Sequence, residues 1–310
     1  MANFTEETFV PQVYELLDHK SAYNISSGIY LILIALVTIT ANGLLLIGLY
    51  KNENGSLRRP STVFICNLLG TGLIAGAVSE LLLAIAYLSS YAGDHTSATL
   101  NLTMAAKVIR SVCVVVSILT AVGFSWTFFA PSQSIPKENQ SEISSKECLM
   151  SIIAYWIYAI LFFTLASAIA TWELYLKLEL HLNFTVCLVL TVLTYLSLWV
   201  YYMNRRTTVD VQFDTIADNA QIREQRRLKH QLLFVICFLV VIDISCVTPY
   251  FIYQHVLLYT KMESIVTRQR TLIVERVIEV ILCHKFILEP ILLVWRLPDY
   301  RRALVSVFVS

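Results

Sequence analysis

Three ionisable residues of this sequence lie inside long apolar runs. Asp243 lies two turns before Pro249, and Lys285 and Glu289 lie four residues apart on one helical face. A charged side chain at the centre of a bilayer costs about 3 kcal/mol or more, so such residues pair with one another and mark functional sites. We expect Asp243, Lys285 and Glu289, together with Asn42, to form an intramembrane polar cluster that acts either as a structural lock or as a switch.

A second set of charged residues lies near the other ends of the same runs. It consists of Glu80, Lys107, Arg110, Glu275, Arg276 and Glu279, with Val108, Tyr250, Phe251 and Tyr253 as further candidate ligand-contacting residues. Ligand pockets between helices combine apolar walls with a few polar groups. The mixed charge favours an unidentified peptide, zwitterion or acidic small molecule as the extracellular ligand, although the aromatic residues are also consistent with plain packing.

Other kinds of chemistry find little support in the sequence. No nucleophile and base stand in a catalytic arrangement, so no enzymatic activity is expected. The seven cysteines are scattered singly, with no histidine spacing that suits zinc, so no metal site, disulfide framework or cofactor is expected. A net charge of +1 gives no basic field for nucleic acid.

The elements that carry these residues are predicted from composition and run length. Of the 310 residues, 57% are hydrophobic and 15% are charged, against about 25% charged in soluble domains. A bilayer core needs about 20 helical residues to cross it, and backbone groups in lipid must pair within the segment. Seven runs qualify: 28–50, 62–88, 104–130, 148–172, 180–202, 231–258 and 271–295. The predicted fold is all-α, a bundle of seven transmembrane helices.

Loop charges predict the orientation of the bundle. With the N-terminus outside, 14 of the 23 Lys and Arg residues fall on the inner side, as the positive-inside rule requires. The glycosylation sequons at Asn3, Asn24, Asn101 and Asn183 would then be extracellular, and those at Asn54 and Asn139 cytoplasmic. We expect a plasma-membrane protein with an extracellular segment 1–27, a membrane domain 28–296 and a cytoplasmic amphipathic helix with a short tail, 297–310.

Short motifs recur along the predicted helices in a fixed order. They are Ala41-Asn42-Gly43-Leu44-Leu45, Asn67-Leu68-Leu69, Trp156, Cys246-Val247-Thr248-Pro249, Glu289-Pro290-Ile291-Leu292-Leu293 and Asp299-Tyr300-Arg301-Arg302-Ala303-Leu304. In order and spacing this set resembles the rhodopsin-like (class A) G protein-coupled receptors over nearly the whole chain. The resemblance implies seven helices, an interfacial eighth helix, an extracellular ligand and a heterotrimeric G protein as the inner partner.

The departures from the family pattern fall on its switch positions. Gly72 replaces the second-helix aspartate, and we expect Glu289 to face the slot left by Gly72. Ser125-Trp126-Thr127 replaces the acid-Arg-Tyr triplet, while Val247 and Leu293 replace the sixth-helix tryptophan and the seventh-helix tyrosine.

The same alignment bears on the ligand and on the function. Val108 stands where amine receptors hold an aspartate, and Cys283 stands where animal opsins hold the retinal lysine, so the sequence favours neither of these ligands. The leading interpretation is a divergent ligand-responsive receptor. A non-signalling seven-helix scaffold or decoy is the alternative, and a transporter is a weaker one because no internal repeat is found.

Overall fold

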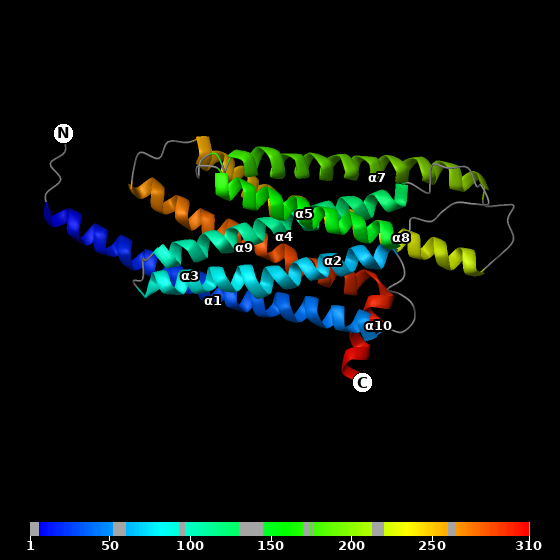
Figure 1. The fold of residues 1–310 in the computed structure, drawn as a ribbon, viewed down its shortest axis with the longest axis horizontal. Coiled ribbons are helices and arrows are strands. Elements are labelled where there is room, and N and C mark those ends of the chain that lie inside the picture. The colour runs from blue at the N-terminus through cyan, green and yellow to red at the C-terminus, as the bar shows by residue number, and fades with distance from the viewer. Residues whose placement is uncertain are drawn as a thin grey trace.

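The computed structural model describes residues 6–51, 60–92, 97–129, 145–169, 174, 177–212, 220–259 and 265–309. Every regular element within these ranges is a helix. The long helices lie side by side in an elongated bundle, with the start of α1 extending beyond one end and α10 lying at the other (Figure 1). We call the end near α10 the inner end and the opposite end the outer end. The predicted all-helical bundle is confirmed.

The helices follow the predicted runs closely. Their bounds are α1 Glu6–Lys51, α2 Pro60–Ile74, η2 Ala75–Glu80, α3 Leu81–Tyr91, α4 Ser97–Phe129, α5 Ser145–Ile169, η4 Glu179–Phe184, α7 Thr185–Gln212, α8 Ala220–Tyr259, α9 Ile265–Arg296 and α10 Pro298–Val309. Since η2 joins α2 to α3 and η4 leads into α7, the described chain passes along the bundle seven times before α10. Helix α1 already begins at Glu6, within the segment expected to precede the first span.

Length and apolarity identify six of these passes as candidate membrane spans. They are Tyr23–Lys51, Ser61–Tyr91, Ser97–Trp126, Ser145–Leu165, Glu179–Val200 and Gln231–Tyr259. Helix α9 is long enough to cross, but its five charged residues from Glu275 to Glu289 lower its apolarity. It nevertheless packs against α1, α2 and α8 inside the bundle. The chain is therefore a multi-pass membrane protein whose last span is held by its neighbours.

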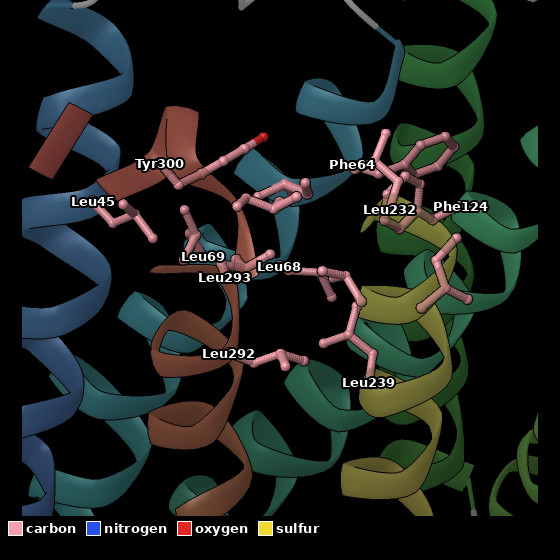
Figure 2. Packing of buried hydrophobic residues seen from close by; sticks show 14 of the residues in the cluster. Leu45, Phe64, Leu68, Leu69, Phe124, Leu232, Leu239, Leu292, Leu293 and Tyr300 are labelled. Carbon is pink, nitrogen blue, oxygen red and sulfur yellow. The ribbon is translucent and has the colours of Figure 1, made fainter. Parts of the chain in front are cut away.

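A buried apolar cluster holds the inner half of the bundle together. Leu45 of α1, Leu69 of α2 and Leu293 of α9 are fully buried in it, and Tyr300 of α10 packs on them (Figure 2). Most side chains of α5 and α7 instead face outward, as expected for helices in contact with lipid. Helix α10 is the predicted eighth helix, with Ala303 buried and Phe308 exposed.

Two π-helical turns belong to the described spans: η2 lies within Ser61–Tyr91, and η4 begins Glu179–Val200. Each places a glutamate inside the bundle. η2 ends at Glu80 and η4 begins at Glu179, and both side chains are buried. A π turn widens the helix locally and shifts the register of the residues after it, and such turns are frequent at functional sites.

Helix α10 approaches α1 most closely at Gly48. A Cβ built on Gly48 would lie 2.4 Å from the carbonyl oxygen of Ala303, a separation that no side chain tolerates. The absence of a side chain at this position therefore lets the eighth helix dock on the first.

Replacing Gly48 by Ala should push α10 away from α1 and destabilise the protein by about 1–3 kcal/mol through overpacking. The measurement is the melting temperature of the purified protein in detergent. Gly70→Ala is the matched control, because no atom lies within 4 Å of a Cβ at Gly70. That variant should match or slightly exceed the wild type, since Ala favours a helix more than Gly does. Equal melting of both variants would contradict the close packing of α10.

Candidate functional site

A buried ammonium group lies at the junction of α4, α8 and α9. Lys285 Nζ is 2.7 Å from Asp243 Oδ1 and also contacts the carboxylate of Glu289. It donates a hydrogen bond to Ser117 Oγ at 2.7 Å, and Ser117 Oγ donates to Glu289 Oε1 at 2.9 Å. All four side chains are buried, and that of Lys285 is completely inaccessible. Asp243, Lys285 and Glu289, here called the core triad, thus join α8 to α9 through one cation, and Ser117 adds α4.

Asn42 belongs to a separate contact. Its Nδ2 donates to the carbonyl oxygens of Thr38 at 2.8 Å and Phe286 at 3.0 Å, which ties α1 to α9. A Cβ on Gly72 would lie 2.7 Å from Asn42 Oδ1. The expectation that Glu289 faces the slot left by Gly72 is therefore wrong, because the Asn42 amide fills that slot.

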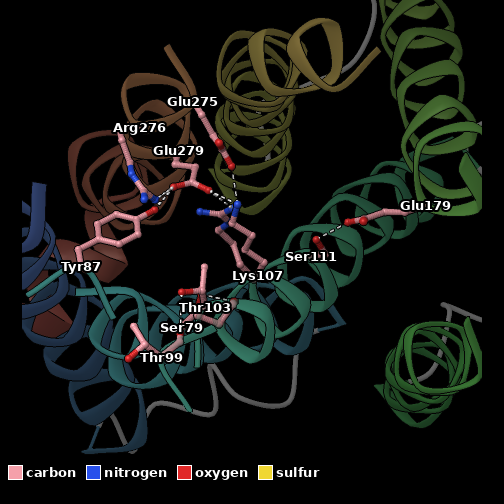
Figure 3. A network of polar contacts seen from close by, with 12 residues as sticks. Ser79, Tyr87, Thr99, Thr103, Lys107, Ser111, Glu179, Glu275, Arg276 and Glu279 are labelled. Carbon is pink, nitrogen blue, oxygen red and sulfur yellow. Dashed lines mark hydrogen bonds and ion pairs between the residues drawn. The ribbon is translucent and has the colours of Figure 1, made fainter. Parts of the chain in front are cut away.

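A second polar site centres on the buried carboxylate of Glu279, which contacts several cationic side chains near the outer end of α9 (Figure 3). Its Oε1 lies 3.0 Å from Lys107 Nζ and 3.5 Å from Arg110 Nη2, and its Oε2 lies 3.4 Å from Arg276 Nη1. The hydroxyl of Tyr87 also donates to Oε2.

Lys107 reaches a second carboxylate, since its Nζ lies 2.5 Å from Glu275 Oε1. The guanidinium of Arg276 lies over the ring of Tyr87 at 3.4 Å. We call this set of residues the outer network: Tyr87, Lys107, Arg110, Glu275, Arg276 and Glu279. Lys107 and Arg276 each keep 22% of their side-chain area exposed, whereas Glu279 keeps 2%. The network is thus open on one side and closed on the other.

A small recess adjoins the outer network on the side of η4. It is lined by Glu179, Leu180, Phe184, Tyr250, Gln254 and Leu258. Glu179 Oε1 accepts a hydrogen bond of 2.5 Å from Ser111 Oγ of α4. The guanidinium of Arg110 lies 5.7 Å from the centre of the Tyr250 ring. Tyr250 therefore connects the recess to the network.

The other residues predicted to contact a ligand are placed differently. Glu80 is buried, and among the described residues neither of its carboxylate oxygens has a hydrogen-bond partner. Val108 and Phe251 pack partly buried against an apolar cluster, and Tyr253 is buried.

Solved structures provide the comparison that decides the fold. The crystal structure of squid rhodopsin superposes with a TM-score of 0.74 at 15% sequence identity, covering 93% of this chain and 86% of that one. The chain therefore has the rhodopsin-like fold. No protein-family model and no curated protein sequence matches it.

Several of the motif residues hold this rhodopsin-like bundle together. Trp156 Nε1 donates to Asn67 Oδ1 at 2.9 Å, and Asn67 Nδ2 donates to Thr120 Oγ1 at 2.7 Å, which joins α5, α2 and α4. Pro249 and Pro290 lie inside α8 and α9. Cys246 and Tyr300 are buried in α8 and α10.

The triplet that replaces the acid-Arg-Tyr sequence is only partly buried. Ser125 is buried and donates to the carbonyl oxygen of Ala121. Trp126, in contrast, is 69% exposed, and the side chain of Thr127 lies outside the described residues. Trp126 therefore lies largely outside the packed core and carries no charge in place of the arginine.

The four outer sequons lie in different environments. Asn101 is exposed on the first turns of α4, Asn24 is largely buried in α1, and Asn3 lies outside the described residues. The sequon at Asn183 is predicted to be extracellular, but Asn183 lies in η4, is 1% exposed and accepts a hydrogen bond of 2.7 Å from the Tyr158 hydroxyl. An oligosaccharide on Asn183 is incompatible with this packing.

Sequence reasoning missed the neutral partners of the charged groups. Ser117 completes the core triad, and Tyr87 and Ser111 bind carboxylates of α9 and η4. Hydroxyl residues are common in apolar helices, so their type alone gave no signal. Only the position of Ser117 opposite a buried charge could have identified it.

Replacing Lys285 by Met should leave two buried carboxylates without their cation and cost about 3–5 kcal/mol. The expected result is a large loss of surface expression and a lower melting temperature of the purified protein. Ser117→Ala is the milder comparison, since it removes hydrogen bonds to charged groups, worth about 1.5–3 kcal/mol, and leaves the ion pairs of Lys285 in place. Wild-type stability of the Lys285→Met variant, with Asp243 and Glu289 intact, would exclude a role for the triad.

Proposed function

We propose that the chain is a membrane receptor that binds an extracellular ligand at the outer network and the adjoining recess. In this proposal it lies in the plasma membrane with its N-terminus outside and its C-terminus in the cytoplasm. The ligand shifts the packing of α9, and an inner partner, a heterotrimeric G protein, responds to the change. The rhodopsin-like fold supports this general class.

The connection between the two polar sites on α9 is the observation that carries the proposal. Glu279 of the outer network and Lys285 of the core triad are six residues apart, about 9 Å along the helix axis. Glu279 contacts Lys107 and Arg110 of α4, while Lys285 contacts Asp243 of α8. A ligand that competes for Glu279 therefore changes the position of α9 relative to both neighbours. Buried charge pairs between helices provide the discrete alternative packings that such a switch needs.

The charges of the outer network indicate the ligand class. Three cationic side chains, Lys107, Arg110 and Arg276, face the two carboxylates of Glu275 and Glu279. Arg110 Nη1 has no hydrogen-bond partner among the described residues, so it is suited to an anionic group. A ligand that carries both charges, such as a peptide terminus or an amino-acid-like molecule, satisfies both sets of residues.

A non-signalling scaffold or decoy is the second candidate function. It is favoured by the exposed position of Trp126 and by Val247 and Leu293, which are buried apolar side chains at two switch positions. Such a protein would keep the core triad purely as a structural lock.

Arg110→Ala and Glu279→Ala should each abolish or strongly reduce the ligand response, because each removes a charge that the ligand contacts. The measurement is a second-messenger assay in transfected cells, screened with peptides and charged small molecules and normalised to surface expression. Leu100→Ala, at an exposed apolar position on the outer part of α4, is the control and should respond like the wild type. A full response in both charge variants contradicts the ligand site, and the absence of any signalling in the wild type favours the scaffold.

Glycosylation tests the proposed orientation independently. Asn101, exposed near the outer end, should carry sugar, so Asn101→Gln should reduce the mobility shift that a glycosidase produces on a gel. Asn183→Gln should leave the shift unchanged because Asn183 is buried, and Asn139→Gln should leave it unchanged because that loop is cytoplasmic in this proposal. Sugar on Asn139 would reverse the orientation.

A further inference from the structure

Two histidines from separate helices meet at the outer end of the bundle. His181 of η4 and His255 of α8 have ring centres 5.2 Å apart, and their planes are inclined at 83°. His181 is exposed, and His255 is half-buried beside the ring of Phe251. The pair lies apart from the outer network and takes no part in the ion pairs described above.

Each of these histidines has one ring nitrogen engaged and the other without a partner. His255 Nδ1 lies 3.1 Å from the carbonyl oxygen of Phe251, which can only accept, so Nδ1 carries the proton and Nε2 keeps its lone pair. His181 Nε2 lies 2.7 Å from the hydroxyl of Tyr259, and no contact involves His181 Nδ1 among the described residues. Metal-binding histidines have this arrangement, in which the second nitrogen donates to an oxygen that fixes the ring.

We propose that His181 Nδ1 and His255 Nε2 bind a transition-metal ion of the Zn²⁺ type between η4 and α8. Two imidazoles on one tetrahedral Zn²⁺, with Zn–N distances of about 2.0–2.1 Å, have their ring centres about 5 Å apart. The observed separation is 5.2 Å, which matches the spacing of two imidazoles that share an ion. Hydrogen bonds to the carbonyl of Phe251 and the hydroxyl of Tyr259 then orient the rings of His255 and His181, respectively.

The composition of the site determines its selectivity. No group of three or more His, Cys, Asp or Glu residues gathers for metal binding in the described part of the chain, so the two histidines are the protein ligands proposed here, with water in the remaining positions. Imidazole binds Zn²⁺ and Cu²⁺, whereas Mg²⁺ and Ca²⁺ require oxygen ligands. The site should therefore respond to Zn²⁺ or Cu²⁺ and not to Mg²⁺ or Ca²⁺.

Metal binding would add a link between η4 and α8 to the existing contact of His181 with Tyr259. α8 also carries Asp243 of the core triad. An ion bound to both histidines would hold the outer end of α8 against η4. This contact lies next to the recess that Tyr250 and Glu179 line. The proposal does not depend on the identity of the ligand or on signalling.

Thermal unfolding of the purified full-length protein in detergent tests the site directly. After treatment with EDTA, added ZnCl₂ should raise the melting temperature to a plateau, because an ion that binds only the folded state stabilises it. MgCl₂ and CaCl₂ should have no effect. His181→Ala and His255→Ala should each abolish the zinc response, and Tyr259→Phe should weaken zinc binding by about 10–100-fold through loss of the support behind His181.

His284→Ala is the matched control, because both nitrogens of His284 are already engaged, with Tyr30 and with the carbonyl of Val280. This variant should keep the full zinc response. Bound Cu²⁺ should give an electron paramagnetic resonance signal split by two nitrogens in the wild type and by fewer in either alanine variant. An undiminished zinc response in both His181→Ala and His255→Ala, or no response in the wild type, overturns the proposal.

Discussion

The structure depends on the rule that a charge inside a bilayer needs a partner inside the protein. Helix α9 carries five of these charges, and among them Lys285 finds partners on α8 and α4, and Glu279 on α4 and α3. Buried ion pairs add little net stability compared with apolar packing, but breaking one is strongly destabilising. The pairs therefore act chiefly by specifying one rotation and depth of α9, which in turn positions both polar sites.

Much of the architecture and part of the site follow from the sequence. The length and apolarity of the runs predict the helices, and the cost of a charge in lipid is enough to select Asp243, Lys285 and Glu289 as a group. The rotation of each helix about its own axis cannot be predicted in the same way. The contact of Asn42 with Gly72 depends on that rotation, and so does the burial of Asn183, which lies within the change of register at the π turn η4.

The chain keeps the rhodopsin-like fold but not the switch residues of the resembling family. The rhodopsin-like arrangement persists at 15% identity because it rests on packing and on links such as the Trp156–Asn67–Thr120 chain. At positions that operate the switch in the resembling family, Val247 and Leu293 are buried apolar side chains here and Trp126 is largely exposed. Polar contacts at new positions, centred on Lys285, occupy the middle of the bundle. Any signalling by this chain must therefore use a different internal path within the same framework.

The charge content of α9 has a consequence for how the protein is made. The translocon passes a segment into lipid when its own apolarity is sufficient, and α9 does not meet the standard that the other six spans meet. We therefore expect its insertion during synthesis to depend on α4 and α8, which precede it in the chain and offer Ser117 and Asp243 as partners. The order of the helices along the chain therefore suits this order of assembly. The span with the most charges, α9, follows the helices that carry its partners.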